Sequence, residues 1–238
     1  MKALLAILFG FAKMAKFGKF LFSGGSMLLS VVVYGAMFGW RYAAGFVGLI
    51  FFHEMGHYLT AKQRGLNVGL PTFIPFVGAW IQLKEQPHDA ETEAYIGIAG
   101  PVLGTVAAFA CYLLADGQSG LLLALAYAGF ILNLFNLIPV SPLDGGRVLG
   151  IVSPKVWGVG LIALIGTFFI QPNPLIALIA IMALPQVWSA WTGKTQVPAG
   201  YYSVAPVVRY KYLAQYLLLV GFLGVMSATV HQQMATGL

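Results

Sequence analysis

Long stretches without charged side chains make up most of this chain. The stretches that are uncharged or nearly uncharged cover 20–40, 42–61, 94–115, 117–143, 156–193 and 212–238. A helix needs about 20 predominantly apolar residues to cross the hydrocarbon core of a bilayer. Gln171-Pro172-Asn173-Pro174 is typical of a turn between two helices and divides the longest stretch. The sequence therefore predicts an all-α polytopic membrane protein with six to seven transmembrane helices.

The composition excludes the common soluble classes. Only 8% of the residues are charged and 59% are hydrophobic, whereas a soluble domain carries roughly 25% charged residues. So few charges could not cover the surface of a soluble protein of this size. A soluble enzyme, a disordered chain and a coiled coil are all inconsistent with these values. Cys111 is the only cysteine, so the chain forms no intrachain disulfide.

The basic residues predict an orientation. If the N-terminus is cytoplasmic, twelve of the thirteen Lys and Arg residues fall on the cytoplasmic side, and only Arg41 falls on the other. Cytoplasmic loops of membrane proteins carry such an excess of bases. We therefore expect a multi-pass protein of the cytoplasmic membrane with its N-terminus toward the cytoplasm. The net charge of +6 thus reflects topology, and without a basic stripe on a soluble surface we expect no nucleic-acid partner.

The first 22 residues differ from the rest of the chain. Four lysines share one broad helical sector of 1–22, and apolar residues occupy the remainder. This pattern favours an amphipathic helix in the inner membrane interface over a cleaved signal peptide, because no typical cleavage site follows. We expect residues 23–238 to form one transmembrane domain.

Two of the seven acidic residues lie in or beside apolar helices, where charges are costly and usually functional. Glu54 belongs to the HExxH sequence His53-Glu54-Met55-Gly56-His57. A spacing of four places both imidazoles on one helix face, which suits two ligands of a tetrahedral zinc ion. Glu54 is then placed to act as a general base on a metal-activated water. The alternative is a pair of hydrogen-bonded core histidines with an incidental glutamate.

A catalytic zinc site usually has a third protein ligand. The candidates are His88, Cys111, Asp144 and His231, of which Asp144 is expected at the same depth as the histidines. Two prolines precede Asp144 and two glycines follow it, so this segment is irregular and should line a cavity or be buried in protein. The alternative is an Asp-Gly turn at a helix end, paired with Arg147.

With these motifs, the chain resembles the site-2 protease family of intramembrane zinc metalloproteases. The matching segments are HEMGH at 53–57, AGPVLG at 99–104 and NLIPVSPLDGG at 136–146. The resemblance implies that His53, His57 and Asp144 bind Zn²⁺. It also implies that Glu54 is the general base and that Asn136 holds the substrate or the developing oxyanion.

The resemblance further implies an activity. It indicates an intramembrane zinc metalloendopeptidase that cleaves transmembrane segments of membrane-anchored proteins, as in regulated intramembrane proteolysis. The orientation expected from the basic residues places this active site toward the cytoplasm. The motifs cover a core from about 45 to 150 within a metalloprotease domain at 23–238, and no PDZ-like or CBS-like insertion is visible. Family members often have Asn at the position of Gly104. A close helix-packing role for Gly100 and Gly104 therefore fits better than a polar one.

Residues 69–85 are apolar, aromatic and contain two prolines. We expect a strand-like hairpin that dips into the membrane beside the active site. Its edge could pair with an unwound substrate by strand addition. The alternative is an interfacial loop that anchors the protein.

Other functions predict other patterns. A polytopic transporter, or a metal or proton carrier with a buried His/Asp site, would spread ionisable residues over several helices and often contain an inverted repeat. Here these residues converge on two motifs, and no repeat is found. An inactive relative would lack a zinc ligand or the general base, and this chain has all four residues, His53, Glu54, His57 and Asp144. A metalloprotease with a glutamate as third ligand needs one in a later span, and the last glutamate is Glu93.

Overall fold

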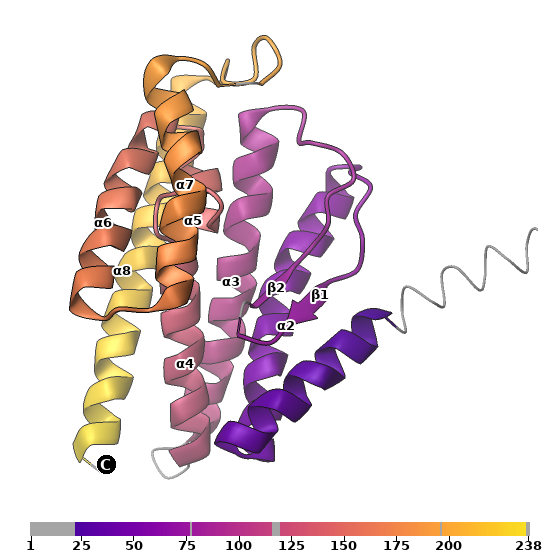
Figure 1. The fold of residues 1–238 in the computed structure, drawn as a ribbon, viewed down its shortest axis with the longest axis vertical. Helices are drawn as coiled ribbons and strands as arrows, with labels where there is room; N and C mark the ends of the chain where they lie inside the picture. Colours follow the sequence, from indigo (N-terminus) through magenta and orange to yellow (C-terminus); the bar gives the residue numbers. More distant parts are fainter. Residues whose placement is uncertain (1–21, 77, 116–119, 196, 237–238) are drawn as a thin grey trace, which may run out of the picture.

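A computed structural model describes residues 22–76, 78–115, 120–195 and 197–236. Apart from Phe22, the predicted interfacial helix at 1–22 lies outside the described residues. The described chain is mostly helical, with one small sheet (Figure 1). Its helices are Phe22–Phe38, α2 (Trp40–Gln63), α3 (Ala90–Ala115), α4 (Gly120–Asn136), α5 (Asp144–Gly150), η1 (Pro154–Val156), α6 (Trp157–Ile170), α7 (Pro174–Thr192) and α8 (Pro206–Thr236).

Among the described residues, three helices are both long enough and apolar enough to cross a membrane, namely α3, α7 and α8. The helices Phe22–Phe38, Gly120–Asn136 and Pro154–Ile170 are apolar but shorter. Although α2 has 24 residues, its polar HExxH sequence lowers its hydropathy. The structure thus supports a helical membrane protein without confirming six to seven crossings.

The turn predicted near 171–174 is confirmed. Helix α6 ends at Ile170 and α7 begins at Pro174. The Asn173 side chain accepts a hydrogen bond from the Leu175 N–H at 2.8 Å and so caps α7. The two helices pack against each other on one side of the molecule, and α2 and the hairpin lie on the other (Figure 1).

The predicted hairpin is present. Strands β1 (Thr72–Ile74) and β2 (Gly78–Trp80) are antiparallel, and Phe73 lies opposite Ala79. Helix Phe22–Phe38 lies along β1. Its Ser26 Oγ accepts a hydrogen bond from the Phe73 N–H at 3.2 Å, and its Tyr34 Oη accepts one from the Phe76 N–H at 2.8 Å. Helix Phe22–Phe38 therefore covers the outer edge of β1.

An irregular segment at 137–143 links α4 to α5, and Asp144 follows it as the first residue of α5. The Leu143 N–H donates to the Val140 carbonyl at 2.8 Å, and the Tyr216 hydroxyl of α8 donates to the Leu137 carbonyl at 2.6 Å. Gly145 lies against the backbone of Leu137, where a Cβ atom would overlap it. These contacts fix the start of α5, and with it the Asp144 carboxylate, against the end of α4.

Candidate metal centre

His53, His57 and Asp144 converge on one buried point between α2 and α5. The Asp144 Oδ2 atom lies 3.1 Å from His53 Nε2 and 3.2 Å from His57 Nε2. The two Nε2 atoms are 3.2 Å apart. All three residues are buried and form the one group of potential metal ligands found among the described residues.

The opposite nitrogen of each imidazole fixes its tautomer. The His57 Nδ1–H donates to the Ile96 carbonyl at 2.8 Å, because a carbonyl oxygen can only accept. The His53 Nδ1–H donates to Asn133 Oδ1 at 2.8 Å, and the Asn133 amide donates in turn to the Gly129 carbonyl at 2.7 Å. With Nδ1 protonated on both neutral rings, each Nε2 directs a lone pair at the Asp144 carboxylate.

Three electron-pair donors facing one another at this distance fit a bound cation. Zinc-bound nitrogen and oxygen atoms lie about 2.0–2.2 Å from the metal. Two ligands of a tetrahedral site are then about 3.3 Å apart, close to the 3.1–3.2 Å observed here. Two imidazoles and a carboxylate also form a donor set of the kind that catalytic zinc sites use. The residues present therefore fit a tetrahedral metal site with one position left open.

Glu54 is buried beside these ligands, at 6% exposure. It follows His53 directly in α2 and precedes His57 by three residues. Across the described chain, no hydrogen bond engages its carboxylate. The group is therefore free to accept a proton from a molecule bound at the open position.

Arg147 contacts the opposite side of the Asp144 carboxylate. Its Nη1 atom lies 3.7 Å from Asp144 Oδ1, while Oδ2 faces the histidines. The Asp–Arg pairing considered as the alternative is therefore present together with the ligand cluster. It leaves one carboxylate oxygen to the cluster and turns the other toward the guanidinium.

Two glycines of α3 provide room for the cluster. A Cβ atom at Gly100 would overlap the His57 ring, and one at Gly104 would overlap the Asn133 amide. Gly56 of α2 lies equally close to the Ala99 carbonyl. The close packing predicted for Gly100 and Gly104 is confirmed. It also explains the residue at 104, because a larger side chain would displace the amide that orients His53.

The other sequence candidates lie elsewhere. Asn136 is half-buried and its amide donates to the Leu132 carbonyl of its own helix at 3.0 Å. Cys111 is half-buried in α3, and the His231 ring of α8 packs against the Tyr127 ring of α4 with centroids 5.6 Å apart. His88 precedes α3 in a loop. None of these four residues belongs to the cluster of potential ligands.

Sequence reasoning missed Asn133, whose side chain holds His53. An amide within an apolar helix is costly and therefore informative. The family motif includes Asn136 and not Asn133, so the resemblance assigned a role only to Asn136. The signal that could have identified Asn133 is its position one turn earlier on the same apolar helix.

The loop between α7 and α8 and the start of α8 contact the start of α3 and the segment after α5. The Tyr201 hydroxyl donates to Glu93 Oε2 at 2.6 Å, and the Ala90 N–H donates to the Tyr201 carbonyl at 3.0 Å. Arg209 donates to the carbonyls of Tyr202 at 2.7 Å and Val152 at 3.1 Å. Burial and the Glu93 charge raise the pKa of Tyr202 to about 12, and they also raise the pKa of Tyr201.

Parts of this chain are similar to known proteins. Residues 41–120 match the model of peptidase family M50. A zinc metalloprotease of Methanocaldococcus jannaschii is 33% identical over 112 residues, which are 44% of this chain and 32% of that protein. A probable chloroplast zinc metalloprotease of Arabidopsis thaliana is 28% identical over 155 residues, covering 45% of this chain and 28% of that protein.

Among solved structures, a site-2 protease from Methanocaldococcus jannaschii aligns with a TM-score of 0.45 and 22% identity, over 73% of this chain and 88% of that one. The chain spans about a third of the length of the curated relatives it matches, 32% and 28% for the two named above. The family predicted from the three motifs is confirmed for residues 41–120, which match a peptidase family M50 (site-2 protease) domain.

Proposed function

We propose that this chain is an intramembrane zinc metalloendopeptidase that cleaves transmembrane segments of membrane-anchored proteins. The observation that carries the proposal is the convergence of two Nε2 lone pairs and one carboxylate oxygen beside the buried Glu54. The family match and the names of the relatives, which are zinc metalloproteases, support the same activity.

In this proposal His53, His57 and Asp144 hold the zinc ion. When bound, zinc polarises the scissile carbonyl and makes water acidic enough to lose a proton near neutral pH. The Ile96 carbonyl and the Asn133 amide keep both imidazoles in the tautomer that offers Nε2 to a metal. Arg147 keeps Asp144 Oδ1 turned away from the histidines, so that Oδ2 alone faces the site.

Glu54 moves the proton. Its carboxylate oxygen takes a proton from the attacking water as the water adds to the scissile carbonyl carbon. The resulting carboxylic acid then gives that proton to the departing amide nitrogen, so the peptide C–N bond breaks with a neutral amine as leaving group. Because no hydrogen bond from the described residues holds the carboxylate, it can turn from the water to the leaving nitrogen.

We propose that the hairpin presents an unwound substrate to this site. A transmembrane helix hides its carbonyl groups in its own hydrogen bonds and must become extended before it reacts. The Phe73 N–H points away from β2 to Ser26, so Phe73 and Ala79 form a non-hydrogen-bonded pair. The Ala79 N–H and C=O therefore point to the outer edge of β2, where a substrate strand could pair with them.

Other parts of the proposal rest on the sequence. We place the N-terminus and the active site toward the cytoplasm, in the cytoplasmic membrane, because the basic residues favour that side. The metalloprotease domain extends over 23–238. Asn136 is proposed to contact the substrate or the oxyanion with the amide hydrogen that it does not donate to Leu132.

A detergent assay with a single-span substrate tests the function. We expect the wild-type chain to bind zinc and cleave the substrate. Glu54→Gln should keep the metal and lose about 10²–10⁴-fold in cleavage rate, the range for a general acid–base residue. Wild-type protein that neither binds zinc nor cleaves any membrane substrate would contradict the proposal. Metal uptake into vesicles by both forms, without cleavage, would instead indicate a carrier.

A further inference from the structure

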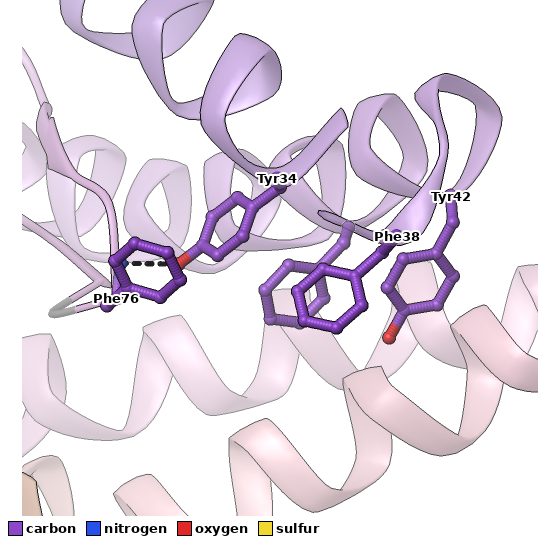
Figure 2. Close-up of a pocket in the computed structure, with 5 residues that line it drawn as sticks. Tyr34, Phe38, Tyr42 and Phe76 are labelled. Atoms are coloured by element: carbon purple, nitrogen blue, oxygen red, sulfur yellow. Dashed lines mark hydrogen bonds between the residues drawn. The ribbon is translucent and has the colours of Figure 1, made fainter. Parts of the chain in front are cut away.

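Five aromatic residues line an open pocket on the hairpin side of α2. The pocket has a volume of about 510 Å³ and is lined by Tyr34, Phe38, Tyr42, Phe46 and Phe76 (Figure 2). Two rings meet Tyr34 edge to face: Phe46 at 5.6 Å between centroids and Phe76 at 5.4 Å. The pocket is as large as many small-ligand sites, and no charged side chain lines it.

Phe76, which lines the pocket, has an unusual backbone conformation that packing alone does not require. Phe76 has a φ of 66°, in the left-handed region that bulky residues rarely adopt. The hydrogen bond from its N–H to the Tyr34 hydroxyl holds the turn, as the dashed line in Figure 2 shows. Its ring nevertheless remains 53% exposed. Strained conformations that the surroundings enforce are concentrated at binding and catalytic sites.

The pocket and the metal centre share one face of α2. The spacings between Tyr42, Phe46, His53 and His57 are four, seven and four residues, which places all four within a sector of about 60° around the helix. Tyr42 and Phe46 stack with centroids 5.9 Å apart. Phe46 and His53 are about 10 Å apart along the helix axis. An extended chain covers that distance in about three residues.

The hairpin flanks this face between the pocket and the metal centre. The buried side chain of Phe73 packs in one cluster with Val47 and Ile50 of α2, and Ala79 packs against the same cluster. A substrate strand on the outer edge of β2 would therefore follow α2 from one site to the other. This continuity favours a segment of substrate as the occupant over a lipid chain.

We propose that the aromatic pocket binds a large apolar side chain of the substrate, about three residues from the scissile bond. The pocket lies on the side of the metal centre toward the N-terminal end of α2. This proposal rests on the proteolytic function proposed above. Aromatic substrate residues should bind best because the pocket rings can meet them edge to face. Charged residues should be rejected, because the pocket offers them no partner.

Cross-linking tests occupancy without requiring turnover. The full-length Glu54→Gln protein is mixed with single-span substrates that carry a photoreactive benzoylphenylalanine at successive positions. We expect cross-links to peptides containing Phe38, Phe46 or Phe76 only from a position about three residues from the bond that wild-type protein cleaves. Cross-links scattered over many substrate positions, or absent from these three peptides, would overturn the proposal.

A cleavage assay tests the preference. Replacing the substrate residue at that position by Ala should slow cleavage by wild-type protein about tenfold or more. Phe38→Ala and Phe46→Ala should reduce this ratio to about twofold or less. Phe38 is 56% exposed, so its truncation should leave the fold intact. Phe169→Ala, an 80% exposed ring on α6, is the matched control and should keep the wild-type ratio.

The outcomes separate the two proposals. Cleavage with an unchanged ratio in both pocket variants would overturn the pocket and leave the protease standing. A lipid that co-purifies with wild-type protein but not with Phe46→Ala, together with an unchanged ratio, would identify an acyl chain as the occupant and would also overturn it. Failure of wild-type protein to cleave any membrane substrate would overturn the proteolytic function and the pocket with it.

Discussion

Helices α3 and α7 are both apolar enough to cross a membrane, but α3 is buried in the protein to a greater extent than α7. In the most apolar part of each helix, 39% of α3 is buried inside the protein and only 17% of α7. The small residues of α3 lie against His57 and Asn133, where an added methyl group would overlap them. On α6, the partner of α7, Gly166 has no atom within 4 Å of such a methyl group.

This difference shows that apolar composition identifies a membrane helix but does not reveal which of its residues must fit particular neighbours. Most of the large side chains of α6 and α7 are exposed, and these exposed apolar residues need only match the lipid. In α2, α3 and α4, residue size and polarity are set by particular neighbours, because unpaired buried polar groups are costly. Substitutions of the same kind in the two regions should therefore have very different consequences.

The largest contrast should come from removing a ligand. His57→Ala leaves two of three donors, so we expect zinc to be lost and cleavage to fall by about a thousandfold or more. Ile162→Ala on α6, where the side chain is 72% exposed, should change neither property. Metal analysis of the purified proteins and single-turnover cleavage provide the measurements. Full zinc content in His57→Ala would reject His57 as a ligand.

The same one-methyl change can be made in both regions. Gly100→Ala forces a methyl group into the His57 ring, and we expect a loss of about 1–3 kcal/mol in the free energy of unfolding together with weaker zinc binding. Gly166→Ala meets open space and should be neutral or stabilising, because alanine favours a helix by about 0.5–1 kcal/mol. Thermal unfolding in detergent with a zinc titration compares them. Equal behaviour of the two variants would remove the proposed difference between the regions.

Much of this arrangement follows from local sequence. The apolar runs predicted the helices, the Pro-rich turn separated α6 from α7, and the spacing of four predicted two histidines on one face. The segment at 69–85 predicted the hairpin, which is confirmed. Each of these features depends on residues that are close in the chain. The same polar residues that mark the site make α2 less apolar than the three helices that could cross a membrane.

What the sequence could not provide depends on docking between helices. Asn133 and Asn136 are three residues apart and so differ by about 60° around α4. Only the rotation of α4 against α2 decides which amide meets His53. Tyr34 and Phe76 are likewise joined by a contact over 42 positions. Neither amphipathic periodicity nor motif spacing contains this information, because both ends of each contact lie in apolar surroundings.

The two asparagines provide a finer test. Asn133→Ala leaves the His53 Nδ1–H without its acceptor, and loss of such a group typically weakens metal binding about 10–100-fold. Asn136→Ala should change zinc affinity by about twofold or less, because Asn136 contacts its own helix. Titration with a competing chelator measures both. A larger loss of zinc affinity for Asn136→Ala than for Asn133→Ala would show that the orienting role had been assigned to the wrong amide.

The smallest effect should come from the loop outside the membrane-spanning helices. Tyr201→Phe removes the hydroxyl that donates to Glu93, and we expect a loss of about 1–2 kcal/mol in the free energy of unfolding with zinc affinity unchanged. Burial and the Glu93 charge raise the pKa of Tyr201 above its usual value of 10.0. Below pH 10 the tyrosine is protonated in both the folded and the unfolded chain, and the full contribution of the hydroxyl is present.

Above pH 10 the unfolded chain releases the tyrosine proton while the folded chain keeps it, so the wild-type protein loses stability relative to Tyr201→Phe. Denaturant titrations in detergent at pH 8 and at pH 10.5–11 should therefore show the difference between the two proteins narrowing as the pH rises. A difference that grew with pH would mean that the folded protein stabilises the tyrosinate. In that case the Tyr201–Glu93 hydrogen bond could not be what fastens the loop between α7 and α8 to the start of α3, since a tyrosinate has no proton to donate.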